Sequence, residues 1–231
     1  MSDAQNHLIE RLPRKERMRL LALCEPVELV FGQVVCEPGE RTRHVYFPVG
    51  GFISLLAKIE GKDAALEVGM VGREGMLGVQ IALGLRTSPL HALVQGPGSA
   101  WRMGTGDFRR QLTRSPALRD GLGLYACVVM QQLASSAACL RFHEIAPRLA
   151  RWLLMSHDRA HADSFHVTQE FLASMLGVRR VGVTRAASEL QRAELIEYRR
   201  GALTILDRAG LERASCSCYA TDRRSYADVL A

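Results

Sequence analysis

The sequence predicts an α+β protein with an N-terminal antiparallel β-roll of the cupin-like jelly-roll type, a long dimerisation helix and a C-terminal winged helix-turn-helix. Fourteen of the 20 glycines lie before residue 110, where short β-rich runs alternate with turn residues. Residues 116–145 instead have a helical pattern, and residues 167–206 have that of two short helices and a hairpin. We therefore expect a β-roll with an N-terminal helix over 1–116, the long helix over 117–146 and the winged domain over 147–231.

The first part alternates between strand-forming and turn-forming residues. A helix is expected before it, over Asp3–Leu23, with Leu8, Leu12, Met18 and Leu21 as apolar contacts. The expected strands are Val27–Phe31, His44–Phe47, Phe52–Lys58, Ala65–Met70, Ala92–Gln95 and Ala100–Met103. Turns are expected at Glu37–Glu40, Pro48–Gly51, Glu60–Lys62 and Gly96–Gly98. Short strands at this spacing are typical of an antiparallel barrel or sandwich.

The long helix has an apolar seam in steps of four and three residues, formed by Leu122, Ala126, Val129, Leu133, Ser136 and Leu140. Such a seam packs either on the helix's own domain or on the same helix of a second copy. A helix of 30 residues is about 45 Å long, which is more than a small barrel can cover. This favours a homodimer. Pro147 is expected to break the helix and form a hinge near Phe142–Arg148.

Residues 168–190 carry the pattern of a helix-turn-helix. Thr168 can cap a first helix, whose apolar face holds Leu172 and Leu176, and Gly177 can end it with a positive φ. Val178 would fill the corner between the helices. A second helix follows near Arg179 or Arg180, and its inward residues would be Val183, Ala186, Ala187 and Leu190.

This inward face leaves basic residues on the outer side of the second helix, at the end that enters the major groove of DNA in such motifs. The hairpin over Leu195–Ile205 carries further arginines at its tip, where they would lie along phosphates. The alternative is a bundle corner that carries arginines by chance. The candidate DNA-binding residues are Thr168, Arg179, Arg180, Val181, Thr184, Arg185, Arg199 and Arg200.

Charge and composition narrow the function classes. The net charge of +6 and pI near 9.2 favour an anionic partner, and 27 of the 30 basic residues are arginine, which suits phosphate and guanine but is also typical of GC-rich genomes. No signal peptide is apparent and no apolar run approaches the ~20 residues of a membrane span, so we expect a cytoplasmic protein with no membrane partner. No nucleophile motif, phosphate loop or converging histidines indicate an enzyme.

Six cysteines are scattered along the chain, and a disulfide framework is not expected in the cytoplasm. Only Cys216 and Cys218 are closely spaced, and one such pair without a companion is poor evidence for zinc. We expect buried or incidental thiols, no metal and no other cofactor. The tail from Cys216 to Ala231 is polar and is assigned no role.

The order of these parts resembles the Crp–Fnr family, the cyclic-AMP receptor and fumarate–nitrate regulators. The resemblance covers roughly residues 10–210. It is most specific in Leu172–Gly177, Arg180, Val183 and Arg185, and looser in His44–Gly51 and Val71–Gly78. It implies a sequence-specific, dimeric transcription regulator that binds a near-palindromic operator and RNA polymerase. Many members carry glutamate where this chain has Val181, so we expect a different operator sequence.

The resemblance also implies an effector site after Gly78. Arg86 and Thr87 are candidates for a shifted phosphate clamp, but no carboxylate between Gly78 and Ala100 could hold a ribose. We therefore expect no tight binding of cyclic AMP, and the effector stays unknown. The cysteines do not suit an iron–sulfur cluster, whereas His44, His91 or His143 leave haem open. An alternative function is a ligand-binding module that regulates a partner protein.

Overall fold

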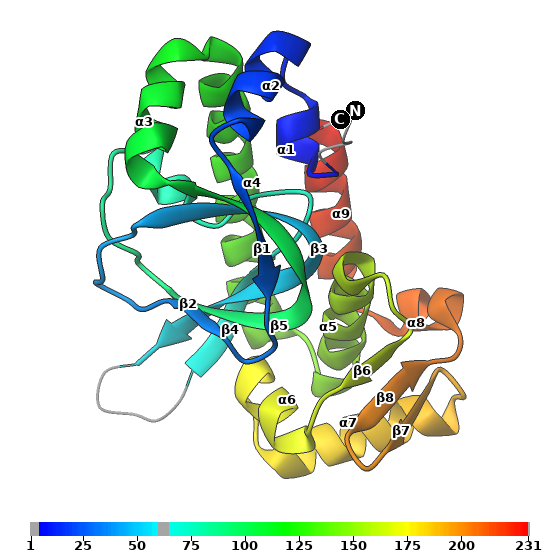
Figure 1. Cartoon of the computed structure of the whole chain (residues 1–231). Coiled ribbons are helices and arrows are strands. Elements are labelled where there is room, and N and C mark those ends of the chain that lie inside the picture. The colour runs from blue at the N-terminus through cyan, green and yellow to red at the C-terminus, as the bar shows by residue number, and fades with distance from the viewer. Residues whose placement is uncertain (1–4, 60–64, 231) are drawn as a thin grey trace.

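The computed structural model describes residues 5–59 and 65–230. A sheet domain occupies one end, a helical domain with a small second sheet the other, and one long helix runs along the side of the sheet domain (Figure 1). Two helices precede the sheet, α1 (His7–Glu10) and α2 (Arg14–Leu21), instead of the single helix expected over Asp3–Leu23. Pro13 separates them, and Asp3 lies outside the described residues. Leu8 and Leu12 are buried as expected, but Met18 is 60% exposed.

The sheet domain confirms the antiparallel β-roll. Its strands are β1 (Glu25–Leu29), β2 (Val34–Cys36), β3 (His44–Lys58), β4 (Ala65–Val71) and β5 (His91–Gly104). They pair in the order β1-β5-β3-β4, and β2 also pairs with β5. Strand β2 was not predicted from the sequence. The turn expected at Glu60–Lys62 lies outside the described residues.

Two other expected turns, Pro48–Gly51 and Gly96–Gly98, are wrong. They lie inside β3 and β5, which pair along their length with register shifts between Pro48 and Ile53. At these bulges the two backbones approach so closely that a Cβ at Gly51 would lie 2.2 Å from the Gly96 carbonyl oxygen. A Cβ at Gly98 would lie 2.2 Å from the Gly50 carbonyl oxygen. The glycines are therefore needed for close packing of two bent strands rather than for chain reversal.

Helix α3 (Thr105–Arg114), which was not predicted from the sequence, leads into the long helix α4 (Pro116–Phe142). The expected seam faces inward. Leu122, Ala126 and Ser136 are buried within their own chain, and Val129, Leu133 and Leu140 are half-buried. Among the described residues, α4 is also the one helix that is long and apolar enough to cross a membrane by length and composition alone, a property that core helices share. The expectation that no segment reaches this length was too strict.

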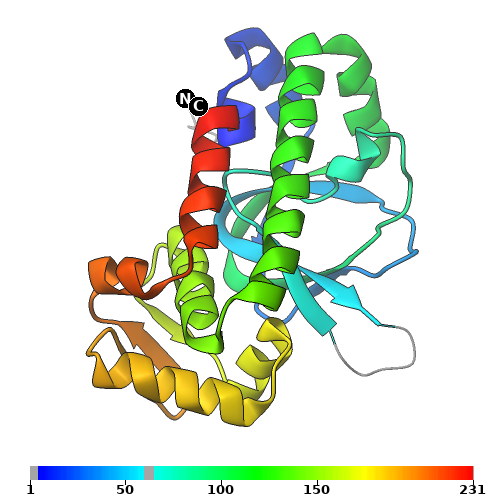
Figure 2. The ribbon, with the colours of Figure 1, turned by 180° about the vertical axis from the view of Figure 1, so that it is seen from behind.

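The polar tail covers part of α4. Helix α9 (Ser217–Leu230) lies alongside α4 and packs against it (Figure 2). Gln132 on α4 connects three elements, because its Nε2 donates to the Tyr226 hydroxyl at 3.2 Å and its Oε1 accepts from the Met70 backbone N–H at 3.1 Å. The buried Arg151–Asp222 ion pair, at 2.6 Å, joins the same tail to the following domain. The tail is thus an integral part of the fold.

The C-terminal domain begins with α5 (Ile145–Ala160), and the break between α4 and α5 lies at His143 and Glu144. Pro147 does not break a helix. It lies in the first turn of α5, where its missing N–H has no helical partner to lose. The remaining elements are β6 (Ser164–His166), α6 (Gln169–Leu176), α7 (Arg180–Arg192), β7 (Ile196–Arg199), β8 (Ala202–Ile205) and α8 (Arg208–Ala214).

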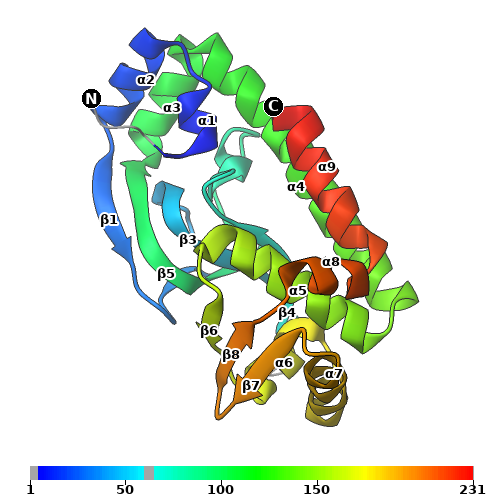
Figure 3. The ribbon, with the colours of Figure 1, turned by 90° about the vertical axis from the view of Figure 1, so that its right-hand side faces the viewer.

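The two domains share apolar contacts. Phe52 of β3 and Met70 of β4 belong to the core that is otherwise built from the C-terminal helices α5 to α9 and the small sheet. The first helix of the helix-turn-helix, α6, lies against β4, where the Ser174 hydroxyl donates to the Ala65 carbonyl at 3.1 Å. Figure 3 shows α5 and α6 next to the lower end of the large sheet.

A carboxylate is buried at this junction. Glu67 of β4 is half-buried as a residue, but its Oε2 atom is buried and has no hydrogen-bond partner among the described residues. Desolvation raises the pKa of Glu67 from its usual 4.5 to about 7, against smaller opposing contributions from Ser54 and from Arg151, Trp152 and Arg159 of α5. The folded protein therefore binds this proton more tightly than the unfolded chain does.

Stability should consequently fall between pH 4.5 and about 7. The contribution of the protonated Glu67 is fully present below pH 4.5 and is lost as the pH rises through 7. We expect Glu67→Gln to be more stable than the parent at pH 8 by roughly 2–3 kcal/mol, and similar to it at pH 5. Urea unfolding at the two pH values measures this difference. Glu28→Gln, at an exposed position, is the control, and equal pH profiles for parent and Glu67→Gln would contradict the expectation.

Candidate nucleic-acid interface

The first helix of the helix-turn-helix has the predicted caps. The Thr168 hydroxyl accepts a hydrogen bond from the Phe171 N–H at 3.1 Å, and Gly177 ends α6 with φ +61°. Leu172 and Leu176 are buried, and Val178 packs against the core at the corner. Local sequence therefore fixes the angle at which the chain enters α7.

The second helix presents the predicted faces. Val183, Ala186, Ala187 and Leu190 are buried, whereas all five predicted outward residues are exposed: Arg179, Arg180, Val181, Thr184 and Arg185. The side chain of Val181 is largely in solvent, because the residue is 78% exposed. The separation follows from helical periodicity, since positions three and four residues apart share a face.

The N-terminal end of α7 is favourable for an anion. Arg179 occupies the N-cap position without a side-chain cap, so the first N–H groups of the helix carry no side-chain acceptor there. The partial positive charge of a helix N-terminus adds to that of the neighbouring arginines. The Thr184 hydroxyl donates to Gln169 Oε1 at 2.7 Å and so ties this end to the start of α6.

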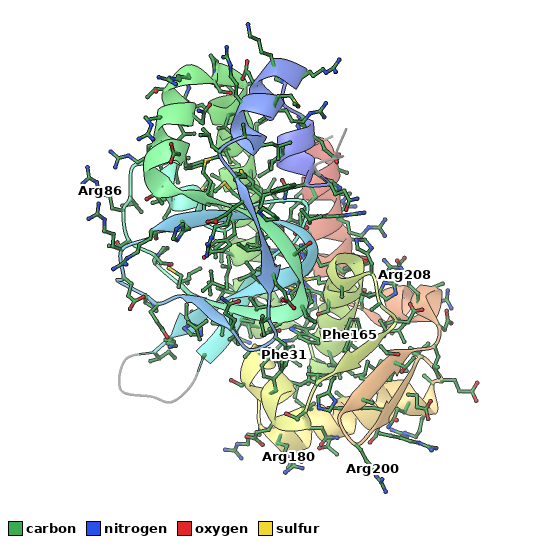
Figure 4. The ribbon with its side chains drawn as sticks, in the orientation of Figure 1. Phe31, Arg86, Phe165, Arg180, Arg200 and Arg208 are labelled. Carbon is green, nitrogen blue, oxygen red and sulfur yellow. The ribbon has the colours of Figure 1, made fainter. Side chains whose placement is uncertain are left out.

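The hairpin is also present, and its tip is a two-residue turn. Arg200 has φ +50° and Gly201 φ +84°, which is typical of the turns that join twisted strands. Arg199 and Arg200 are exposed, and Arg199 pairs with Glu197 at 3.2 Å on the surface. In Figure 4, Arg180 and Arg200 both project from the end of the molecule that is remote from the sheet domain.

Part of this surface was not predicted from the sequence. Strand β6 pairs with β8 and widens the hairpin to a three-stranded sheet. It brings the exposed ring of His166 next to the hairpin tip, since a Cβ at Gly201 would lie 3.2 Å from His166 Cε1. The β6 segment has three residues, too few for its alternation to be recognised.

The candidate effector residues are not brought together. A cavity of about 370 Å³ in the sheet domain is lined by Gly78, but its charged lining comes from Glu40, Arg41 and Arg43, beside His44. Arg86 and Thr87 are exposed on the outer loop and do not line it, and Figure 4 shows Arg86 pointing to solvent. The loop Glu40–His44 has no recognisable motif, so it could not be predicted as part of a site.

Comparisons with known proteins agree with this architecture. Residues 147–214 match the Crp-like helix-turn-helix domain model. A Crp/Fnr-family protein from Eubacterium rectale superposes with a TM-score of 0.69 at 14% identity, covering 88% of this chain and 94% of that one. FixK2 from Bradyrhizobium japonicum superposes with a TM-score of 0.69 at 14% identity, covering 84% of this chain and 98% of that one. No curated protein sequence matches.

A third similar structure is CLP from Xanthomonas campestris, described as a global regulator responsive to c-di-GMP. It has a TM-score of 0.66 at 18% identity and covers 84% of this chain and 100% of that one. At these identities the structures show the fold, while the domain model assigns the C-terminal part. Residues 147–214 therefore carry a Crp-like helix-turn-helix domain, and the chain as a whole has the fold of these Crp/Fnr-family structures.

Proposed function

We propose that two copies of this chain bind a near-palindromic operator, with α7 of each copy in the major groove and the β7–β8 hairpin on the flanking phosphates. The observation that carries the proposal is the separation of faces on α7, which buries its apolar side and leaves three arginines exposed at its N-terminal end. In this geometry Arg180 and Arg185 contact base edges or adjacent phosphates, and Val181 touches a thymine methyl group or no base. Arg179, Thr184 and Thr168 lie beside the phosphates, as do Arg199 and Arg200 of the hairpin.

The dimer is proposed to form through the outer face of α4. That face is exposed in the single chain and runs in steps of three and four residues: Leu124, Cys127, Gln131, Ala134, Ala138 and Arg141. Met130, 62% exposed, lies beside it. Small residues let two helix backbones approach closely, and the spacing is that of a two-stranded coiled coil. The pairing surface is therefore the face opposite Leu122, Ala126 and Ser136. A dimer that binds two adjacent half-sites needs its two α7 helices about 34 Å apart.

The sheet domain is proposed to sense a small molecule and to shift the winged domain at His143–Glu144. The cavity lined by Arg41 and Arg43 suits an anionic group, although Glu40 adds a carboxylate to the same wall. No residue from the loop after Gly78 adds a carboxylate, so cyclic AMP is expected to bind weakly. Isothermal titration with cyclic AMP measures this, and micromolar or tighter affinity would contradict it. A cytoplasmic location and contact with RNA polymerase complete the proposal.

The salt dependence of duplex binding tests the proposed function. If three to five arginines of each copy neutralise phosphates, log K should fall with log salt with a slope of about −5 to −9. Fluorescence anisotropy with an operator selected from random DNA gives this slope. A module that regulates a partner protein would show little salt dependence and no selected sequence, and either result would refute the DNA-binding mode proposed here.

A further inference from the structure

Four potential metal ligands converge where α4 ends and α9 begins. Cys139 and His143 come from the end of α4, and Cys216 and Cys218 flank the first residue of α9. One ligand atom from each lies within 4.8 Å of all the others. The fold thus brings a second pair of potential ligands, Cys139 and His143, next to Cys216 and Cys218.

Two of the distances between these atoms match those around a single tetrahedral ion. Cys139 Sγ lies 3.5 Å from Cys216 Sγ, and Cys218 Sγ lies 3.6 Å from His143 Nδ1. Zinc bonds of about 2.3 Å to sulfur and 2.0–2.1 Å to nitrogen place tetrahedral ligand atoms about 3.4–3.8 Å apart. A two-iron cluster would need a wider set, because its ligands are divided between two metal atoms. A disulfide would need the two sulfurs at about 2.05 Å.

Packing alone does not account for this arrangement. Cys139, Cys216 and Cys218 are 2%, 6% and 8% exposed, and they form a small cluster of their own, separate from the three larger apolar cores. Three thiols and an imidazole that face one another gain little as an apolar core, whereas the same groups are a common ligand set for structural zinc.

The surroundings also suit the charge of such a site. Three thiolates, one neutral imidazole and Zn²⁺ together carry one negative charge. Arg148 and Arg151 are buried near Cys139 and Cys216. Arg151 is paired with Asp222, but no carboxylate lies within ion-pair distance of Arg148 in the described part of the chain. Arg148 donates a hydrogen bond to the Leu176 carbonyl but has no counter-ion there, and an anionic metal centre would offset the cost of its buried charge.

We propose that Cys139, His143, Cys216 and Cys218 bind one Zn²⁺ ion per chain and that this ion fastens the winged domain and the C-terminal helix to the long helix. The thiol protons pass to water as the sulfurs ligate the metal. The position supports a fastening role, because His143 precedes α5 and the Cys216 N–H donates to the Pro147 carbonyl at 3.3 Å. The site therefore closes both ends of the domain over residues 147–214.

The test begins with metal analysis of the full-length protein purified under reducing conditions. We expect about one zinc per chain. After removal of zinc, Co²⁺ should give intense visible bands of a tetrahedral centre and thiolate-to-cobalt charge-transfer bands. Cys218→Ser and His143→Ala should each weaken metal affinity by roughly 100-fold or more, beyond the usual effect of losing an outer-shell partner. Cys36→Ser, which removes a thiol elsewhere, should leave it unchanged.

A chelator should lower the melting temperature of the parent by several degrees and should not affect the metal-free Cys218→Ser protein. The comparison uses Cys218→Ser, so it does not depend on a substitution of the more deeply buried Cys139. The proposal is overturned if the reduced protein binds neither Zn²⁺ nor Co²⁺, if it holds two irons with sulfide, or if Cys139 and Cys216 are found as a disulfide after rapid trapping in cells.

Discussion

Replacing Arg180 and Arg185 together by alanine is expected to weaken operator binding by about 100-fold or more while leaving the fold intact. Each good arginine–guanine pair contributes about 1–3 kcal/mol of discrimination, and a dimer would lose two such residues from each copy. Both side chains are exposed, so their removal takes nothing from the core. Anisotropy titration against the selected operator, with circular dichroism for the fold, measures the effect.

The matched control removes the same charge elsewhere. Arg109 and Arg114 are exposed on α3 of the sheet domain, far from the winged domain along the fold. Arg109→Ala/Arg114→Ala should change operator affinity only slightly, by the loss of long-range attraction. If the two double variants bind equally well, the assignment of α7 as the reading helix is wrong.

Two glutamates on the outer face of α4 are expected to give a monomer. Ala134 and Ala138 are exposed on the proposed pairing surface, and Ala134→Glu/Ala138→Glu would set four carboxylates against one another in the dimer. Glutamate favours helix, so the single chain should stay folded. Because two linked half-sites bind about 10²–10⁴-fold more tightly than one, affinity for the palindromic operator should fall by at least about 100-fold.

Analytical ultracentrifugation measures the oligomeric state, and operator titration measures the affinity. Ala22→Glu/Ala162→Glu, at exposed alanines off α4, is the control and should stay dimeric with unchanged affinity. A glutamate variant that remains a dimer would place the interface elsewhere. A parent protein that is monomeric at micromolar concentration would remove the basis for cooperative operator binding.

The helix-turn-helix was predictable because its information is local. Thr168, Gly177 and the apolar positions of α7 fix caps, a corner and two faces through contacts within 25 residues of sequence. Features that depend on contacts between distant segments were harder to predict from the sequence. Helix α4 carries two heptad patterns, one through Leu122 and one through Leu124, and only the packing of α9 and the large sheet decides which is buried.

The remaining errors have the same origin. Glycine-rich segments in β3 and β5 look like turns in sequence, because the need for close strand approach depends on a partner strand. Cys139 and Cys216 are 77 positions apart, so a pairwise spacing rule could not join them. The cavity lined by Arg41 and Arg43 likewise depends on how loops meet after folding.

The presence of Phe52 and Met70 in the core of the winged domain limits how any signal can act. Swinging that domain away from the sheet would return both side chains to water, at about 3–6 kcal/mol. An effector that releases the domain must therefore prefer the released form by roughly 10²–10⁴-fold, since a ligand can shift an equilibrium only by its difference in affinity. A weakly discriminating metabolite would leave the protein in its docked form, however abundant it became.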